Sequence, residues 1–214
     1  MSVKVKVCGV TDPANALAAV ELGADYLGLN FYSGSPRFVD IRRAQEIAGA
    51  VAGRVPLVGV FVNASAAEVE ETAGRVGLDL LQFSGDEGPE FVAPFAARAV
   101  KAFRTGGLPG REEMAAYGAV WGMLWGILID APHGSLYGGT GEGWDYGSVR
   151  GGAPERLFLA GGLGPDNARR AVESARPFAI DVCSRVESAP GVKDLELLRR
   201  LFLEVRHGQT QNPS

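Results

Sequence analysis

Short runs of apolar and β-branched residues recur along the chain, and a longer stretch rich in alanine, glutamate and arginine follows each of them. The short runs are typical of strands and the longer stretches of helices. The predicted strands are Val3–Cys8, Tyr26–Phe31, Pro56–Val62, Leu78–Phe83, Ala99–Phe103, Leu124–Asp130, Arg156–Ala160 and Phe178–Val182. The predicted helices begin near Pro13, Ile41, Ala66, Pro89, Arg111, Tyr146, Pro165 and Lys193. We expect Pro13 and Pro165 in first helical turns, because each follows a residue suited to a turn or a cap.

Strands that alternate with helices predict a parallel sheet covered by helices. Eight such units predict an α/β fold, a single (β/α)₈ TIM barrel over residues 1–207, and the polar residues 208–214 predict a disordered tail. A doubly wound open sheet is the alternative fold. Its dinucleotide motif, GxGxxG, is missing after the first strand, where the chain reads Cys8-Gly9-Val10-Thr11.

Composition and charge narrow the classes of function. The 214 residues include 30 glycines, two cysteines and two histidines, and the net charge is −4. A negative chain does not attract phosphate backbones, so we expect no nucleic-acid partner. Two histidines and no CxxC pair predict that there is no metal site. Two cysteines suit a reducing compartment, and the chain shows neither a signal peptide nor an apolar membrane span, so we expect a cytoplasmic protein.

Two candidates for proton transfer stand at predicted strand ends, which is where barrels of this kind place their active sites. Because histidine is so scarce, proton chemistry must fall to a thiol, a carboxylate or an amine. Cys8 ends the first strand on the face that Lys6 shares, and it is either a small buried thiol or a functional one. Asp130 ends the sixth strand, and it is either a loop cap or an acid–base group.

Two further features suggest a bound anion. Gly161 and Gly162 follow the seventh strand, where bare backbone amides ahead of a helix make a phosphate site, and Ser184 after the eighth strand could add a hydroxyl. Plain turn glycines are the alternative. Arg37, in the loop after the second strand, is either a bidentate carboxylate ligand or a solvated loop residue.

Motifs in a fixed order carry a resemblance over about residues 3–205. They are Val5-Lys6-Val7-Cys8-Gly9-Val10-Thr11, Gly23-Ala24-Asp25, Gly28-Leu29-Asn30-Phe31-Tyr32, Ser35-Pro36-Arg37-Phe38-Val39, Gln82-Phe83-Ser84-Gly85, Asp130, Gly138-Gly139-Thr140-Gly141, Trp144-Asp145-Tyr146, Leu159-Ala160-Gly161-Gly162-Leu163, the segment 181–187 and Pro190-Gly191-Val192-Lys193-Asp194. In this combination the chain resembles the phosphoribosylanthranilate isomerase family of tryptophan biosynthesis.

The resemblance implies an Amadori rearrangement of N-(5-phosphoribosyl)anthranilate, a small phosphosugar substrate, without a cofactor. By position, Cys8 matches the family's general base and Asp130 its general acid. Arg37 matches the residue that faces the anthranilate carboxylate, and Asp181 the one near the sugar hydroxyls. The phosphate grip matches Gly161, Gly162 and Ser184. The resemblance leaves the oligomeric state open, with a monomer favoured.

Two residues depart from the family pattern. Ser84 stands where the family usually has histidine, and Arg185 where it usually has glycine. Arg185 would be strained if the backbone there were left-handed, or it could add a cation near the phosphate. Cys183 is a milder departure in the same segment. Whether the segment 138–143 forms a lid is left open.

Two hypotheses concern the thiol of Cys8. Lys6 lies about 6.6 Å away along the same strand face and would raise the thiolate fraction, unless it is a structural lysine paired with a carboxylate. Cys183 follows the eighth strand, which neighbours the first in a closed barrel, so mild oxidation could join the two cysteines.

Three rival functions differ from the isomerase. A pentose-phosphate epimerase needs metal ligands that two histidines cannot supply. Indole-3-glycerol-phosphate synthase, another phosphosugar barrel enzyme, has no support at Cys8 and Arg37. A non-catalytic phosphosugar-binding barrel would explain Ser84 and Arg185 as signs of decay, but both Cys8 and Asp130 are present.

Overall fold

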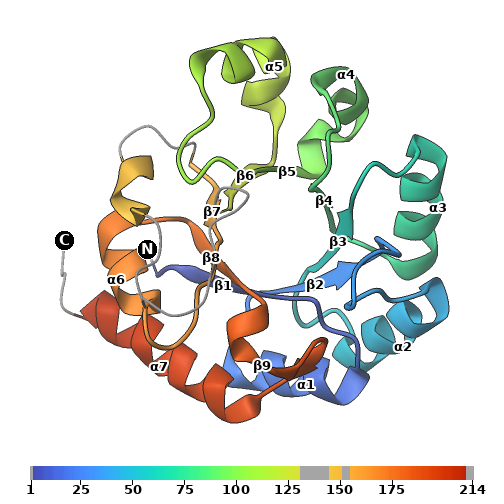
Figure 1. The fold of residues 1–214 in the computed structure, drawn as a ribbon. Coiled ribbons are helices and arrows are strands. Elements are labelled where there is room, and N and C mark those ends of the chain that lie inside the picture. The colour runs from blue at the N-terminus through green and yellow to red at the C-terminus, as the bar shows by residue number, and fades with distance from the viewer. Residues whose placement is uncertain (1, 131–144, 151–154, 211–214) are drawn as a thin grey trace.

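The computed structural model describes residues 2–130, 145–150 and 155–210, with side chains as far as residue 206. Eight parallel strands close into a barrel in chain order (Figure 1). They are β1 (Lys4–Cys8), β2 (Tyr26–Asn30), β3 (Leu57–Phe61), β4 (Leu80–Phe83), β5 (Ala99–Phe103), β6 (Gly126–Ile129), β7 (Leu157–Leu159) and β8 (Ala179–Val182). Because β1 pairs with both β2 and β8, the barrel prediction is confirmed and the open sheet is wrong.

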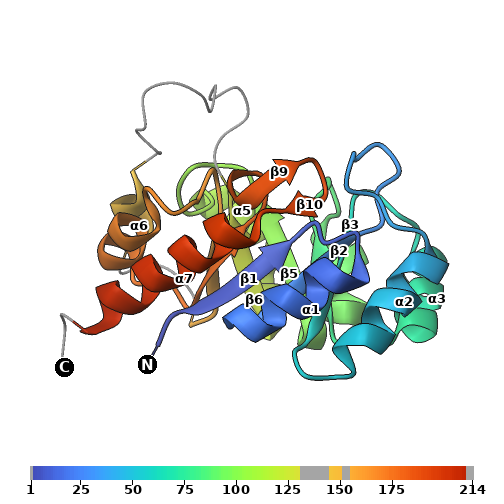
Figure 2. The ribbon, with the colours of Figure 1, turned by 90° about the horizontal axis from the view of Figure 1, so that it is seen from below.

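Helices surround the barrel and connect its strands (Figure 1). The α-helices are α1 (Pro13–Leu22), α2 (Ile41–Val51), α3 (Ala66–Val76), α4 (Pro89–Val92), α5 (Arg111–Met123), α6 (Ala168–Ala175) and α7 (Leu195–Thr210), and the 3₁₀ helices are η1 (Ala93–Arg98), η2 (Tyr146–Val149) and η3 (Ser184–Val186). After η3, β9 (Glu187–Ala189) and β10 (Val192–Lys193) form an antiparallel pair. Figure 2 shows this pair on the side toward which β1 points, so it lies at the mouth of the barrel.

Local chemistry explains where several helices begin. The Asp12 carboxylate accepts hydrogen bonds from the amides of Ala14 and Asn15, and Pro13 opens α1 as predicted. Ser65 and Glu68 form a reciprocal capping box at α3. These caps satisfy amides that a helix cannot pair internally, so the sequence marks these boundaries well.

The start of α6 differs from the prediction. Pro165 does not lie in its first turn, because the Gly164 carbonyl accepts from the amides of Asn167 and Ala168, and the helix begins at Ala168. The Asn167 side chain stabilises this extra turn by accepting from the Gly164 amide at 2.9 Å. A turn held by a side chain three residues ahead therefore displaces the predicted helix start.

The C-terminal helix also shifts the predicted boundaries. Lys193, near which this helix was predicted to begin, pairs in β10 instead, and α7 begins at Leu195. Helix α7 ends at Thr210, so the predicted domain boundary after residue 207 falls inside a helix. Residues 211–214 of the predicted tail lie outside the described residues.

Alternation along the strands separates two cores. Val5 and Val7 join the apolar layer between barrel and helices, on the strand face opposite to Lys6 and Cys8. A second cluster fills the barrel interior, where Tyr26 and Phe158 stack edge-on at 5.7 Å near the strand starts. Lys6 points inward above this aromatic layer and is 1% exposed. The bottom of the barrel is therefore apolar, and its charged interior lies toward the mouth.

Membrane insertion finds no support in the helices. Within the described parts of the chain, no helix combines the length and the apolar character that crossing a bilayer requires.

Candidate active site

A cavity of about 300 Å³ opens at the mouth of the barrel, where β6, β7 and β8 end. It brings together five of the seven predicted site residues. The residues that line it are Asp130, Ala160, Gly161, Gly162, Leu163, Asp181, Cys183, Ser184 and Arg185. Two carboxyl groups, of Asp130 and Asp181, therefore stand beside a glycine turn in one cavity.

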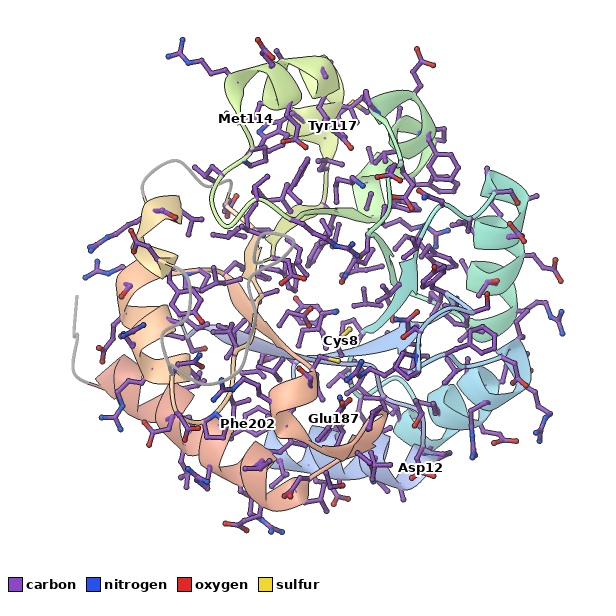
Figure 3. All side chains as sticks on the ribbon, viewed as in Figure 1. Cys8, Asp12, Met114, Tyr117, Glu187 and Phe202 are labelled. Atoms are coloured by element: carbon purple, nitrogen blue, oxygen red, sulfur yellow. The ribbon has the colours of Figure 1, made fainter. Side chains whose placement is uncertain are left out.

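Cys8 and Arg37 are the two predicted site residues that do not line this cavity, and Cys8 is buried, with 8% exposed. The register pairs Val7 with Val182, so the next residues, Cys8 and Cys183, end neighbouring strands side by side. Both thiols are free. Figure 3 shows Cys8 near the middle of the barrel, whereas Phe202 lies on the periphery.

Lys6 is the buried cation beneath Cys8, and its Nζ donates to Asp181 Oδ1 at 2.9 Å. Burial lowers the pKa of Lys6, but the charges of Asp181 and Cys8 outweigh burial, and the pKa rises above its usual value. Lys6 therefore stays protonated. It is both the structural partner of a carboxylate and a neighbour of the thiol, so the two interpretations of its role are compatible.

Asp181 is a carboxyl that holds a proton near neutrality. Burial, with the neighbouring charges of Cys8 and Asp130, raises its pKa to about 7, although Lys6 opposes the rise. A proton near pH 7 is therefore available where Asp130 and Asp181 face the same cavity.

A second buried network lies behind Cys183, and the sequence reasoning assigned none of it a role except Arg37. Glu187 accepts from Arg37 Nη2 at 2.7 Å and from Arg37 Nε at 3.0 and 3.1 Å, a bidentate pairing. Lys193, 0% exposed at its side chain, donates to Glu187 Oε1 at 2.7 Å. Burial raises the pKa of Glu187, but hydrogen bonds from both cations outweigh it and lower the pKa.

Glu187 and Lys193 were missed as functional residues. Both lie inside the motifs quoted for the resemblance, which is the only signal that could have selected them. Figure 3 places Glu187 between Cys8 and α1 in the view from the barrel mouth. Glu187 contacts Arg37 across the closed barrel, and both Glu187 and Lys193 contact Cys183 within their own segment.

The charges around Cys8 favour its thiolate. Three cations, Lys6, Lys193 and Arg37, face two carboxylates, Asp181 and Glu187, in this part of the site. The hydrogen bond from Cys183 and then the charge of Lys6 lower the Cys8 pKa well below its usual range, against the opposing effect of burial.

The glycine turn after β7 has an unusual backbone. Gly161 and Gly162 have φ of 94° and 66°, the left-handed region that disfavours a side chain. Asn167 donates to the Gly162 carbonyl at 3.0 Å and to the Tyr146 hydroxyl at 3.2 Å. Tyr146 in turn donates to the Gly161 carbonyl at 3.3 Å. These bonds turn the carbonyls toward the protein, and they identify Asn167 and Tyr146 as supports that the sequence reasoning missed.

Arg185 shows no sign of the backbone strain considered from the sequence. It lies in η3, and the non-glycine residues with positive φ in the described chain are Ala52, Asn63 and Arg176. Its side chain lies over Gly164, where a Cβ would be 2.8 Å from the Arg185 Cβ, and it donates to Asp166 Oδ2 at 3.3 Å. The guanidinium is thus a cation on the rim of the cavity.

Ser84 lies at the other side of the mouth, in a separate cavity of about 620 Å³. The Gln82 amide donates to its hydroxyl at 3.0 Å. Beside it, Lys101 donates to Glu87 Oε2 at 3.0 Å and to the Gly85 carbonyl at 2.7 Å, and both ionic side chains are buried. This pair braces the loop after β4, so Ser84 stands on a rigid base.

The sequence raised two further points, a lid over the site and a metal ion. The glycine-rich segment 138–143, considered as a lid, lies outside the described residues. Among the residues that are described, no three histidine, cysteine or carboxylate side chains gather in a way that could hold a metal ion.

Comparison with known proteins agrees with the resemblance. The family model for N-(5'-phosphoribosyl)anthranilate isomerase matches residues 5–204. The chain is 43% identical to the N-(5'-phosphoribosyl)anthranilate isomerase of Halorhodospira halophila, over 97% of this chain and 99% of that protein.

Two solved structures extend the comparison to the fold. One shows monomers generated from the dimeric enzyme of Thermotoga maritima; it is 34% identical, with a TM-score of 0.75 over 95% of this chain and 98% of that one. The other is a phosphoribosyl anthranilate isomerase in complex with reduced 1-(o-carboxyphenylamino)-1-deoxyribulose 5-phosphate. It is 32% identical, with a TM-score of 0.77 over 96% of this chain and 99% of that one.

Proposed function

The chain belongs to the N-(5'-phosphoribosyl)anthranilate isomerase family, and on this premise we propose which of its residues carry the reaction. It is an isomerase of tryptophan biosynthesis that converts N-(5'-phosphoribosyl)anthranilate to 1-(2-carboxyphenylamino)-1-deoxyribulose 5-phosphate. The conversion is an Amadori rearrangement, in which an aminoaldose becomes an aminoketose. Its chemistry needs an acid at the ring oxygen and a base at sugar C2.

Asp130 is the general acid and Cys8 the general base of this proposal. Asp130 protonates the ribose ring oxygen, and the anthranilate nitrogen supplies the electron pair that opens the ring to an iminium. The Cys8 thiolate then removes the proton from C2. The resulting enolamine takes a proton at C1 and loses the proton of the C2 hydroxyl, which gives the ketone. The substrate thus gains two protons, at the ring oxygen and C1, and loses two, from C2 and its hydroxyl, so the steps balance without a cofactor.

The observation that carries the proposal is the cationic surrounding of the Cys8 thiol. An unperturbed thiol is only a few per cent ionised at neutral pH. With Lys6 beneath it and Cys183 beside it, the pKa of Cys8 is lowered well below its usual range, so its thiolate is favoured without a histidine to activate it. Asp130 lines a cavity together with Cys183, which follows the strand next to that of Cys8, so the proposed acid and base come from different strands at the same end of the barrel.

The phosphate binds, in this proposal, at the glycine turn. The backbone at Gly161 and Gly162 and the Ser184 hydroxyl line the same cavity, and Arg185 adds a cation on its rim. Guanidinium groups pair well with phosphate oxygens. Arg185 reaches the phosphate by giving up its long ion pair with Asp166.

Arg37 and Asp181 complete the assignment. Arg37 is proposed to face the anthranilate carboxylate, while its bidentate bond to Glu187 holds the guanidinium in place. Asp181 is proposed to contact the sugar hydroxyls, because it lines the cavity opposite the glycine turn. Both roles extend the family resemblance to contacts that this chain can make.

Loss of the fluorescence of the anthranilate adduct, with substrate generated in place, tests the assignment. We expect turnover by the wild type and losses of about 10²–10⁴-fold in kcat for Cys8→Ser and for Asp130→Asn, the range for removing one acid or base. Full turnover by Asp130→Asn would exclude it as the acid, and full turnover by Cys8→Ser would exclude the thiol as the base.

Two further expectations concern the whole molecule. The Thermotoga maritima relative has been obtained both as a dimer and as monomers, and a monomer is proposed for this chain. Sedimentation of the purified protein tests that state. A cytoplasmic location is likewise proposed, and cell fractionation tests it.

A further inference from the structure

Lys193 is a fully buried cation that the acid–base mechanism does not use. Its side chain is 0% exposed, and its Nζ donates to Glu187 Oε1 at 2.7 Å and to the Cys183 carbonyl at 3.4 Å. Its backbone amide donates to the Asn15 side chain at 2.7 Å, and it pairs with Glu187 in the register of β9 and β10. Lysine is almost never buried to this extent without a specific partner, so its place beside Glu187 asks for a reason.

Glu187 joins this lysine to Arg37 and occupies one edge of the guanidinium. It accepts from Nε at 3.0 and 3.1 Å and from Nη2 at 2.7 Å, which is the side-on arrangement. A guanidinium has five N–H donors, and within the described chain Nη1 makes no hydrogen bond. The remaining N–H groups of Nη1 and Nη2 form a second edge, which fits another carboxylate.

Arg37 is the member of this group that reaches the surface of the site. Its side chain is 20% exposed, whereas those of Glu187 and Lys193 are 3% and 0% exposed. A Cβ on Gly9 would lie 2.5 Å from Arg37 Cδ, so the arginine stem lies against the residue that directly follows Cys8. The second guanidinium edge therefore belongs to a partly exposed side chain beside the proposed base.

We propose that Lys193 is a positioning residue for the substrate carboxylate: it balances the charge of Glu187, so that Arg37 is held side-on by Glu187 and still binds the carboxylate with its other edge. The inference rests on the proposed contact of Arg37 with the anthranilate carboxylate. With substrate bound, two cations then face two carboxylates. Without Lys193, one guanidinium would serve two carboxylates, and the extra buried negative charge would weaken binding.

The neighbouring groups leave this task to Lys193. Lys6, the buried cation under Cys8, already donates to Asp181 at 2.9 Å. The Cys183 thiol lies 3.9 Å from Glu187 Oε1, but it carries no positive charge. Within the described part of the chain, the ion pairs of Glu187 are those with Arg37 and Lys193. Lys193 is therefore the cation that offsets Glu187 when Arg37 also serves the substrate.

Calorimetric titration with two phosphosugar ligands tests the proposal without turnover. One ligand is reduced 1-(o-carboxyphenylamino)-1-deoxyribulose 5-phosphate, and the other is the same molecule without the ring carboxyl. We expect the wild type to prefer the first about 10²-fold, and Lys193→Met to lose roughly tenfold of this preference. The double variant Lys193→Met/Glu187→Gln removes both charges and should regain most of it. Binding of the second ligand shows that each variant is folded.

Lys101→Met is the matched control, because it removes the lysine of another buried ion pair, on the other side of the barrel mouth, and should keep the preference. An unchanged preference in Lys193→Met would overturn the proposal. Equal losses in Lys193→Met and the double variant would also overturn it, since they indicate lost packing rather than lost charge balance. Arg37→Met tests the contact beneath the proposal: if this variant keeps the preference, Arg37 is not the carboxylate ligand. A loss in Arg37→Met with none in Lys193→Met refutes the role of Lys193 alone.

Discussion

Gly28 should be essential for the position of the Cys8 thiol, the proposed general base. It lies in β2 and faces the barrel interior opposite Cys8, with which it pairs in register. A Cβ at this position would be 2.7 Å from Cys8 Sγ, 3.1 Å from the Cys8 Cα and 3.1 Å from Lys6 Nζ. Gly28 is not among the glycines with positive φ, so the effect of Gly28→Ala is steric rather than conformational.

The displacement can be worked out from these distances. Ordinary contact begins at 3.4 Å, so the sulfur at 2.7 Å has to retreat by at least about 0.7 Å. The nearby Cα is part of the strand and gives way less easily than the thiol. A misplacement of about 1 Å costs on the order of 10²-fold in rate, so we expect kcat to fall roughly 10- to 100-fold, with a loss of about 1–3 kcal/mol in unfolding free energy.

A matched variant separates rate from stability. Gly59 lies on β3 and faces the outer apolar layer, where a Cβ would meet the Leu78 side chain and lie 2.8 Å from Phe61. Gly59→Ala should lose a similar free energy of unfolding but keep the wild-type kcat per folded molecule. Urea unfolding and initial rates over a range of substrate concentrations provide both numbers. If Gly28→Ala retains kcat within about twofold of the wild type, the steric reasoning is wrong.

Three other changes test separate parts of the site. Lys6→Met should raise the pKa of Cys8, because the nearest buried cation is lost. The pH dependence of alkylation measures this pKa when both variants are made in the Cys183→Ser background, which leaves one thiol. An unchanged pKa would refute the role of Lys6 in stabilising the thiolate. Arg185→Met should raise KM about tenfold with little change in kcat. Arg200→Met, which removes the other cation on Asp166, should change neither KM nor kcat. Equal KM values for Arg185→Met and the wild type would exclude a contact between Arg185 and the phosphate. Hydrogen peroxide should inactivate the wild type reversibly, since two thiols and one peroxide give a disulfide and two waters. If peroxide still inactivates Cys183→Ser, the pairing of Cys183 with Cys8 is contradicted.

The pH dependence of the site follows from two opposite shifts. The pKa of Cys8 is lowered well below its usual range, so we expect activity to be lost only as the pH falls through that lowered value. The pKa of Asp181 is raised to about 7, so the folded chain binds more protons than the unfolded chain between about pH 4 and 7. This carboxyl therefore lowers stability as pH rises through that range, which urea unfolding of Asp181→Asn against wild type measures.

The sequence determined the parts of this protein that depend on near neighbours. Alternating apolar runs predicted the eight strands, and caps such as Asp12 and Ser65 mark helix starts within three residues. Strand ends then placed Cys8 and Asp130 at the mouth, because a barrel gathers the carboxyl ends of all its strands. One predicted helix start was displaced, because the side chain of Asn167 holds an extra turn before α6.

The tertiary structure decided what these residues can do. Lys6 and Asp181 are 175 positions apart, and Arg37 and Glu187 are 150 apart, yet each pair is in contact because β8 closes against β1. Ionisation of Cys8 depends on the sum of those distant charges and on burial, and neither is encoded in the few residues around it. A thiol at a strand end was readable from the sequence, but its state as a base depends on the closure of the barrel.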